Sequence, residues 1–409
     1  MRRLAFLAAV AGALWLAPGA LASGWCGSGE LTTNRPDIVT GRPVHTVVVV
    51  PADGADNFQT SAGQIADDVA SLSAWWVGQD PTRVPRFDLA TFGGATCLDI
   101  SFMRLREPAS ALTDASVAFN TIVNEIDTAG LGDEYRKVLA YYDGPSVEAN
   151  VCGVGGGSFT GPGVAIVIPA GCPGVPTDTV AAHELLHSFG AVPAGAPHAC
   201  PGDSGHPCDS TTDILYPYTQ GEPLSQKVLD YGRDDYYGHS GSWIDIQDSL
   251  WLRHLDTPQE PLALTLSGAG TVTSDVPGVD CTASCTTQWD QGSTVNLSAA
   301  PTATSRFVRW QGSCLAQGTC LLTLDAAKPV AAVFGPLTIP VKTSVVGRGR
   351  VRCSPACSTH FAAGRQLTLV AVPAKGWRFA RWTGSCKGTV TICRPATDFT
   401  VAARATFRR

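Results

Sequence analysis

Apolar and polar positions follow two different periods along the first two thirds of the chain. Positions 45–50 are β-branched apart from His45, whereas apolar side chains recur every three to four positions over 58–77, as at Ile65, Val69 and Trp76. The first pattern predicts a buried strand and the second an amphipathic helix. Further strands are predicted at 98–105, 138–142 and 164–168, and helices at 117–126 and 180–189. Interleaved strands and helices predict an α/β or α+β arrangement, and the fold expected for this domain is α+β with a mixed sheet.

The last part of the chain has a different pattern, with short alternating segments broken by Gly, Pro, Asn and Asp. It also contains a duplication: Cys281, Cys285, Trp310 and Cys314 recur 72 residues later, and Cys320 and Phe334 recur 73 residues later. Strands and turns without a helical period predict two small all-β domains.

The proline-bearing segment 257–261 has the composition of a linker. At the other end, Arg2 and Arg3 precede an apolar run at 4–16 and a small-residue pattern at 20–22, which is typical of a cleaved secretory signal. The expected organisation is a signal peptide at 1–22, a catalytic domain at 23–256, and β-repeat modules at 257–336 and 337–409. No later apolar run is long enough to predict a membrane span.

Charge is distributed unevenly over these regions. Residues 23–260 carry 11 basic and 30 acidic side chains, whereas 337–409 carry 13 basic and one acidic. The overall net charge of −6 therefore conceals an acidic front and a basic tail. A basic module is able to hold the protein on an anionic cell-surface polymer, or to serve only as a spacer. No nucleic-acid-reading motif is present, so nucleic acid is not expected as a partner.

Fourteen cysteines in a chain with a secretory signal predict disulfides, and hence a secreted or cell-surface protein. The close spacings are C-x3-C, C-x5-C and C-x6-C, which differ from the paired C-x2-C of cysteine zinc sites. Four cysteines in each repeat allow three connectivities. Local pairs are favoured because they fit hairpin-sized loops.

A metal-binding pattern lies on the helix predicted at 180–189. His183 and His187 are four positions apart, so both imidazoles project from one face. Glu184 lies beside the first histidine and can act as a general base toward a metal-bound water. Thr177 or Asp178 is expected to cap the helix, and Gly190 to end it.

The segment from His183 to Gly190 resembles the H-E-x-x-H-x-x-G motif of the metzincin zinc peptidases. The resemblance implies a Zn²⁺ cofactor with a third ligand three residues after the glycine, where this chain has Pro193. His198 is the expected third ligand. His206 is its competitor, and Asp209 is a weaker candidate.

The same resemblance extends to a turn beneath the metal, at residues 213–218. Leu215 stands where the family has methionine, and Tyr216 is a candidate for oxyanion stabilisation or for packing alone. Farther on, carboxylates at 230–239 could bind calcium, but their spacing does not match an EF-hand loop. A solvated acidic loop is the favoured interpretation there.

Each repeat also contains F-x-x-W-x-G-x-C, at 307–314 and 379–386, and resembles the bacterial β-repeat modules related to internalin B-repeats. Together these patterns predict a secreted zinc endopeptidase that cleaves extracellular protein or peptide, with Glu184 as catalytic base and His183, His187 and His198 as metal ligands. The alternative is an inactive surface-binding or adhesive protein with a degenerate peptidase domain, suggested by the absent methionine and the displaced third ligand.

Overall fold

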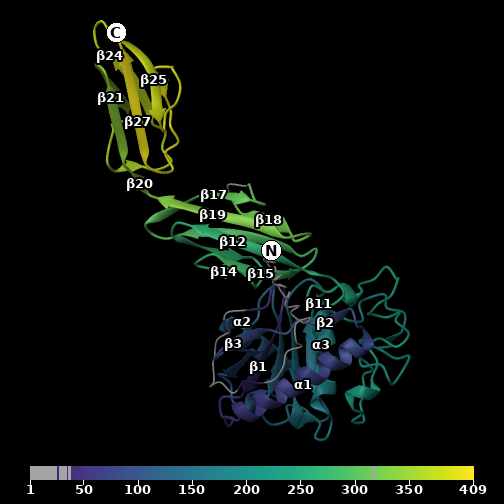
Figure 1. The fold of residues 1–409 in the computed structure, drawn as a ribbon. Coiled ribbons are helices and arrows are strands. Elements are labelled where there is room, and N and C mark those ends of the chain that lie inside the picture. Colours follow the sequence, from purple (N-terminus) through teal and green to yellow (C-terminus); the bar gives the residue numbers. More distant parts are fainter. Residues whose placement is uncertain (1–24, 27–34, 36–37, 316–317) are drawn as a thin grey trace, which may run out of the picture. The chain divides into compact units, whose positions relative to one another are not determined.

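The computed structural model describes residues 25–26, 35, 38–315 and 318–409, so the predicted signal peptide lies outside the described residues. The chain divides into two units, 1–258 and 259–409, and each is described by itself (Figure 1). Within the described part of the chain, no helix combines the length and apolar character needed to cross a membrane.

The first unit is built on a five-stranded mixed sheet with the order β5-β1-β6-β8-β7. Its first four strands run parallel, and β7 runs antiparallel to β8 at the edge. The strands are β1 (Val44–Val50), β5 (Ile100–Arg104), β6 (Lys137–Tyr142), β7 (Gly153–Gly157) and β8 (Gly163–Val167). Such parallel strands require helices on both faces, which explains their continuous apolar runs.

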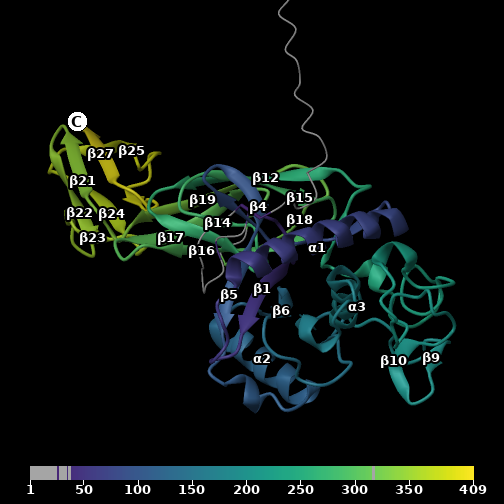
Figure 2. The same cartoon turned by 90° about the horizontal axis from the view of Figure 1, so that it is seen from below.

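Three helices cover the sheet: α1 (Phe58–Gln79), α2 (Ala115–Ala129) and α3 (Thr177–Phe189). Val48 of β1 packs in a core with α1 and α3, whereas Val47 and Val49 pack in a second core with α2. Successive side chains of a strand point to opposite faces, so one valine run serves both cores. Figure 2 shows α1 and α2 on opposite sides of β1 and β6.

Smaller elements complete the first unit. Three two-stranded pairs are β2 (Arg83–Pro85) with β11 (Leu252–His254), β3 (Leu89–Phe92) with β4 (Ala95–Leu98), and β9 (Ala199–Cys200) with β10 (Asp203–Pro207). Short 3₁₀ helices are η1 (Ala109–Ala111), η2 (Pro169–Gly171), η3 (Leu224–Gln226) and η4 (Ile246–Asp248). The prediction of a strand at 98–105 needs correction, because Asp99 separates β4 from β5.

The second unit is all-β, as predicted, and its first module is a pair of four-stranded sheets. These have the orders β15-β12-β19-β17 and β14-β13-β16-β18, and Trp289, Trp310 and Phe334 are buried. The strands are β12 (Gln259–Ser267), β13 (Gly270–Ser274), β14 (Asp280–Cys281), β15 (Cys285–Asp290), β16 (Thr294–Pro301), β17 (Ser305–Gly312), β18 (Cys320–Thr323) and β19 (Lys328–Pro336).

The second module repeats this plan with three-stranded sheets, β21-β27-β25 and β22-β24-β26, and a short pair, β20-β23. Trp382 and Phe407 occupy its core. The strands are β20 (Thr338–Ile339), β21 (Val341–Val346), β22 (Gly349–Ser354), β23 (Phe361–Ala362), β24 (Thr368–Pro373), β25 (Arg378–Gly384), β26 (Ile392–Cys393) and β27 (Val401–Arg408).

All fourteen cysteines form disulfides, which confirms the prediction from their even number. Each repeat contains two local bridges, as expected: Cys281–Cys285 with Cys314–Cys320, and Cys353–Cys357 with Cys386–Cys393. The first unit contains Cys26–Cys97, Cys152–Cys172 and Cys200–Cys208. Persistent disulfides are typical of an oxidising compartment.

Candidate metal centre

Helix α3 holds two of the predicted ligands on one face. Leu185, Leu186 and Phe189 are fully buried, so apolar contacts fix the opposite face of the helix. The helix begins at Thr177 without a side-chain cap, which corrects the expectation that Thr177 or Asp178 caps it. It ends at Gly190, as predicted, with a φ of 84° that favours glycine.

A buried cation secures the end of this helix. The Lys137 ammonium donates hydrogen bonds to the carbonyls of Ser158, Gly161 and Ser188 at 2.9, 3.0 and 2.6 Å. Ser188 lies in the last turn of α3, where carbonyl groups lack helical partners. Burial lowers the pKa of Lys137 to about 7. Lys137, which lies on strand β6, thereby connects the sheet to the C-terminal end of α3.

Glycines of β7 allow the sheet edge to approach the helix closely. A Cβ added at Gly153 would lie 2.7 Å from Glu184 Oε1, and one added at Gly155 would lie 2.5 Å from the Glu184 carbonyl oxygen. A Cβ added at Gly157 would lie 2.3 Å from the Ser188 carbonyl oxygen. Since alternate residues share one face of a strand, these three glycines form the surface against which α3 packs.

The third histidine arrives on the hairpin formed by β9 and β10. The Cys200–Cys208 disulfide joins the two sides of this hairpin, and His206 lies on β10. The bridge limits the movement of a short, loop-like hairpin. His206 is thus held opposite the two histidines of α3.

The three Nε2 atoms face one another. His183 and His187 are 3.1 Å apart, His187 and His206 are 3.1 Å apart, and His183 and His206 are 3.3 Å apart. His183 Nδ1 donates to the Ile214 carbonyl at 2.7 Å, and His206 Nδ1 donates to Asp203 Oδ1 at 2.8 Å. A proton on Nδ1 leaves a lone pair on Nε2, so these bonds direct two lone pairs inward.

This arrangement fits a small divalent cation. With Zn–N bonds of about 2.0–2.1 Å, tetrahedral geometry places two nitrogen ligands about 3.3 Å apart. The separations of 3.1–3.3 Å between the histidine nitrogens are close to that value. Three imidazoles leave a fourth coordination position for water or substrate, as in catalytic zinc sites.

Burial favours the uncharged forms of His183, His187 and Glu184. Burial, followed by the neighbouring His206, lowers the pKa of His183 to about 4. Burial and His183 lower the pKa of His187 well below its usual value. Burial also raises the pKa of Glu184 to about 8, and a cation bound nearby would lower it again. Neutral imidazoles are the form that binds metal.

His198, the expected third ligand, does not join this group. Its backbone N–H donates to Asp235 Oδ1 at 2.8 Å, and its Nδ1 lies 3.2 Å from Asp235 Oδ2. Its ligand atom instead falls within a separate cluster with Asp209, Asp234 and Asp235. The loop after α3 therefore carries His198 away, and the competitor His206 takes the place beside the helix histidines.

The segment at 213–218, which was predicted to pass beneath a metal, lies next to the three histidines. The Ile214 carbonyl accepts the hydrogen bond from His183, and Leu215 is fully buried in the core. Leu215 thus fills the space that an unbranched methionine would fill. Tyr216 lines the same cavity as the three histidines.

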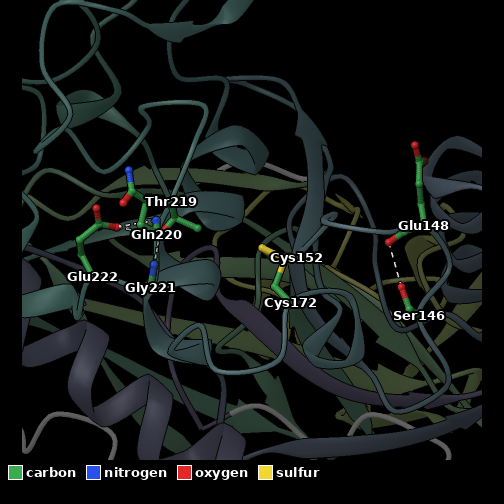
Figure 3. The surroundings of a disulfide bond; sticks show 8 residues. All are labelled: Ser146, Glu148, Cys152, Cys172, Thr219, Gln220, Gly221 and Glu222. Carbon is green, nitrogen blue, oxygen red and sulfur yellow. Dashed lines mark hydrogen bonds between the residues drawn. A yellow bond between two sulfur atoms is a disulfide. The ribbon is translucent and has the colours of Figure 1, made fainter.

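This cavity has a volume of about 890 Å³, within the range of ligand-binding clefts. Its wall includes the Cys152–Cys172 disulfide, which Figure 3 shows between the turns at 146–148 and 219–222. In the second turn Glu222 accepts hydrogen bonds from Thr219 Oγ1 and the Gln220 N–H at 2.9 and 3.0 Å. Hydrogen bonds from its own N–H and that of Gln220 lower the pKa of Glu222 to about 2. In the first turn the Ser146 hydroxyl donates to the Glu148 carbonyl at 2.8 Å, so each turn has an internal hydrogen bond.

Among solved structures, the chain is similar to archaemetzincin from Methanopyrus kandleri, with 17% identity over 45% of this chain and 87% of that chain and a TM-score of 0.24. It is also similar to OgpA from Akkermansia muciniphila, solved in a catalytically inactive form with an O-glycopeptide substrate. That match has 10% identity over 88% of this chain and 95% of that chain, and a TM-score of 0.29. No curated protein matches.

The second unit gives a clearer result. The family model of the divergent InlB B-repeat domain matches residues 262–336 and 339–407. These ranges correspond to the two modules, each with its pair of sheets and two local disulfides. The predicted resemblance to internalin B-repeats is thus confirmed for this part of the chain: residues 262–407 contain two divergent InlB B-repeat domains.

Proposed function

We propose that the first unit is a metzincin-like, secreted zinc endopeptidase. The observation that carries the proposal is the triangle of Nε2 atoms of His183, His187 and His206, with sides of 3.1–3.3 Å, beside Glu184 in one cavity. Three imidazoles that converge on one point and an adjacent carboxylate are the groups that metal-assisted hydrolysis of a peptide bond requires. His206 replaces His198 as the proposed third ligand.

A bound zinc ion supplies a water of lowered pKa and polarises the scissile carbonyl. With the metal held by His183, His187 and His206, Glu184 would be the group that accepts a proton from such a water and passes it to the leaving amine. The Ile214 carbonyl and Asp203 hold His183 and His206 in the orientation that aims their Nε2 atoms inward. Tyr216 faces the same cavity and is able to donate a hydrogen bond to the developing oxyanion.

The sheet edge supports an extended peptide as substrate. Strand β7 pairs with β8 on one side, and Gly153, Val154 and Gly155 of β7 line the cavity. An extended peptide can add to such an edge through main-chain hydrogen bonds, which require no particular side chain. This placement brings the peptide backbone next to Glu184.

The alternative of an inactive adhesive protein is less well supported. It was suggested partly by the displacement of the third ligand, and His206 supplies that ligand from a different position. The absent methionine is replaced by the buried Leu215. Both changes leave the proposed hydrolytic groups in place.

The test combines metal analysis with cleavage of a generic substrate such as casein. The purified chain should contain one zinc ion, and a chelator should abolish cleavage. Glu184→Gln should keep the zinc but lower the rate by a factor of about 10² to 10⁴, the usual contribution of general acid–base catalysis.

Glu107→Gln, at an exposed position far along the chain from the motif, is the matched control and should retain full activity. Absence of zinc from the purified protein would contradict the proposal. Equal cleavage by the Glu184 and Glu107 variants would contradict it as well, because the general base would then lie elsewhere.

A further inference from the structure

The second repeat has a strongly cationic sheet face. On the sheet β21-β27-β25, residues paired in register share one face, and Val401, Ala403, Ala405 and Phe407 of β27 point into the core. The alternate positions point outward. They carry five exposed cations: Lys342, Arg378, Arg381, Arg404 and Arg408.

This charge is not balanced within the module. The only acidic residue of 337–409 is Asp398, and it pairs with Arg306 of the first module. On the cationic face, Arg378 and Arg408 are direct cross-strand partners. Like charges at such positions are destabilising. An anion bound between them would remove that repulsion.

The first repeat shows that the fold does not require three of these five cations, Lys342, Arg404 and Arg408. Gly268 and Gly347 occupy the same place in the two modules, since a Cβ added at either would lie 2.4 Å from the carbonyl oxygen of Phe334 or Phe407, respectively. From this match and the strand registers, Lys342 corresponds to Ala263, Arg404 to Ala331, and Arg408 to Gly335. The equivalents of Arg378 and Arg381 are also arginines, Arg306 and Arg309. Arg306 lies opposite Gly335 and therefore faces no cation across the strands.

We propose that the sheet face of Lys342, Arg378, Arg381, Arg404 and Arg408 binds a linear anionic polysaccharide of the cell surface. The outward rows of the sheet at Ala402, Arg404, Thr406 and Arg408 each hold at least one cation, and successive outward rows are about 7 Å apart. A flat row of fixed charges suits a polymer that carries an anion on each repeat unit. This inference is independent of the peptidase proposal.

Two features favour a polysaccharide over other polyanions. The outward positions of the face contain no aromatic side chain, whereas proteins that bind single-stranded nucleic acid stack bases on aromatic rings. The disulfides of both modules indicate an oxidising compartment. In that compartment the chain meets the polymers of the cell surface.

The experiment compares two double variants of the full chain that lose the same charge from opposite sheets. Lys342→Ala with Arg404→Ala alters the proposed face and introduces the residues of the first module. Arg350→Thr with Arg352→Thr introduces Thr271 and Thr273 of the first module on the outer side of β22. Thermal unfolding checks that both variants fold, and heparin serves as the anionic polysaccharide probe.

The unaltered chain should bind heparin in a salt-dependent manner, and the β21/β27 variant should bind about tenfold more weakly. The β22 variant should keep nearly all of the affinity. Equal losses in both variants would overturn the proposal, because net charge alone would then explain binding. It would also be overturned if the unaltered chain does not bind heparin, or if it binds a short DNA duplex or phosphatidylserine vesicles more tightly.

Discussion

Two histidine clusters of the first unit differ in the partners of their imidazoles. In the cluster of His183, His187 and His206, the Nε2 atoms approach one another, and the partners of two Nδ1 atoms lie outside the triangle. In the cluster of His198 with Asp209, Asp234 and Asp235, the imidazole already bonds a carboxylate of the same group. The first cluster leaves lone pairs directed at a common point, whereas the second pairs its own charges.

The difference shows what makes a ligand set suitable for a metal. Both clusters bring ligand atoms within 4.8 Å of one another, so proximity does not distinguish them. The distinguishing feature is the bond on the far side of the ring, which fixes the tautomer and orientation of a metal-binding histidine. The His198 imidazole instead bonds Asp235, a carboxylate of its own group.

The largest expected effect separates the two clusters directly. His206→Ala should lower zinc affinity by more than about 100-fold, because loss of an outer-shell partner alone costs about 10- to 100-fold. His198→Ala, the matched control, should leave zinc content and affinity unchanged. The measurement is zinc affinity by competition with a chromogenic chelator.

The reverse result, in which His198→Ala releases zinc and His206→Ala retains it, would show that the loop rearranges when metal binds. The sequence-based choice of His198 would then be correct, and the geometry described above would belong only to the metal-free protein.

The sequence was sufficient for the parts of the site that depend on local periodicity. The four-residue spacing of His183 and His187, and the glycine at position 190, indicated the ligand helix and its end. The position of the proposed third ligand, His206, depends on the path of a long loop, which no local period describes. Cys200 and Cys208 flank His206 and form a bridge, so pairing of these two cysteines was the one available signal favouring His206.

Strand β7 was missed for a related reason. Its sequence from Gly153 to Gly157 contains four glycines, and glycine is unfavourable in strands because it has no side chain to pack and loses more backbone freedom. The strand forms because α3 packs against it. Gly153 and Gly155 are needed there for the space they leave, and this tertiary requirement is not visible in strand propensity.

The second prediction concerns Gly155→Ala, which would fill the space between β7 and α3. The added Cβ would lie 2.5 Å from the Glu184 carbonyl and 2.9 Å from His187 Cβ, so α3 must shift. We expect a loss of about 1–3 kcal/mol in the free energy of unfolding, as for other overpacked sites, together with weaker zinc binding. Urea unfolding of the metal-free protein and the chelator assay measure the two effects.

Gly174→Ala provides the matched control for the added methyl group. A Cβ at Gly174 would meet no atom within 4 Å, although its φ of 92° adds backbone strain. This variant should therefore lose some stability but keep its zinc affinity. Unchanged zinc affinity in Gly155→Ala would contradict the close packing of β7 against the ligand helix.

The smallest expected effect concerns how His183 and His198 change the stability of the fold with pH, because the two contributions have opposite signs. The pKa of His183 is lowered from 6.5 to about 4. Between these two pH values the unfolded chain binds more protons than the folded chain. His183 therefore destabilises the metal-free fold increasingly as pH falls through this range. Burial acts to lower the pKa of His198, but the Asp235 carboxylate outweighs this effect and raises it. His198 therefore stabilises the fold below its unfolded pKa, and this contribution is lost as pH rises.

Urea unfolding of the metal-free protein at about pH 5 and about pH 8 tests these signs through the linkage between pKa and stability. Relative to the unaltered chain, His183→Gln should be more stable at the lower pH than at the higher one, because it removes a buried imidazole that resists protonation. His198→Gln should show the opposite trend, and the trend should be small, because its side chain is 41% exposed and water screens its interaction with the carboxylates. The same trend in both variants would mean that the two imidazoles have similar surroundings, and the contrast between an inward-facing metal cluster and a self-paired surface cluster would fail.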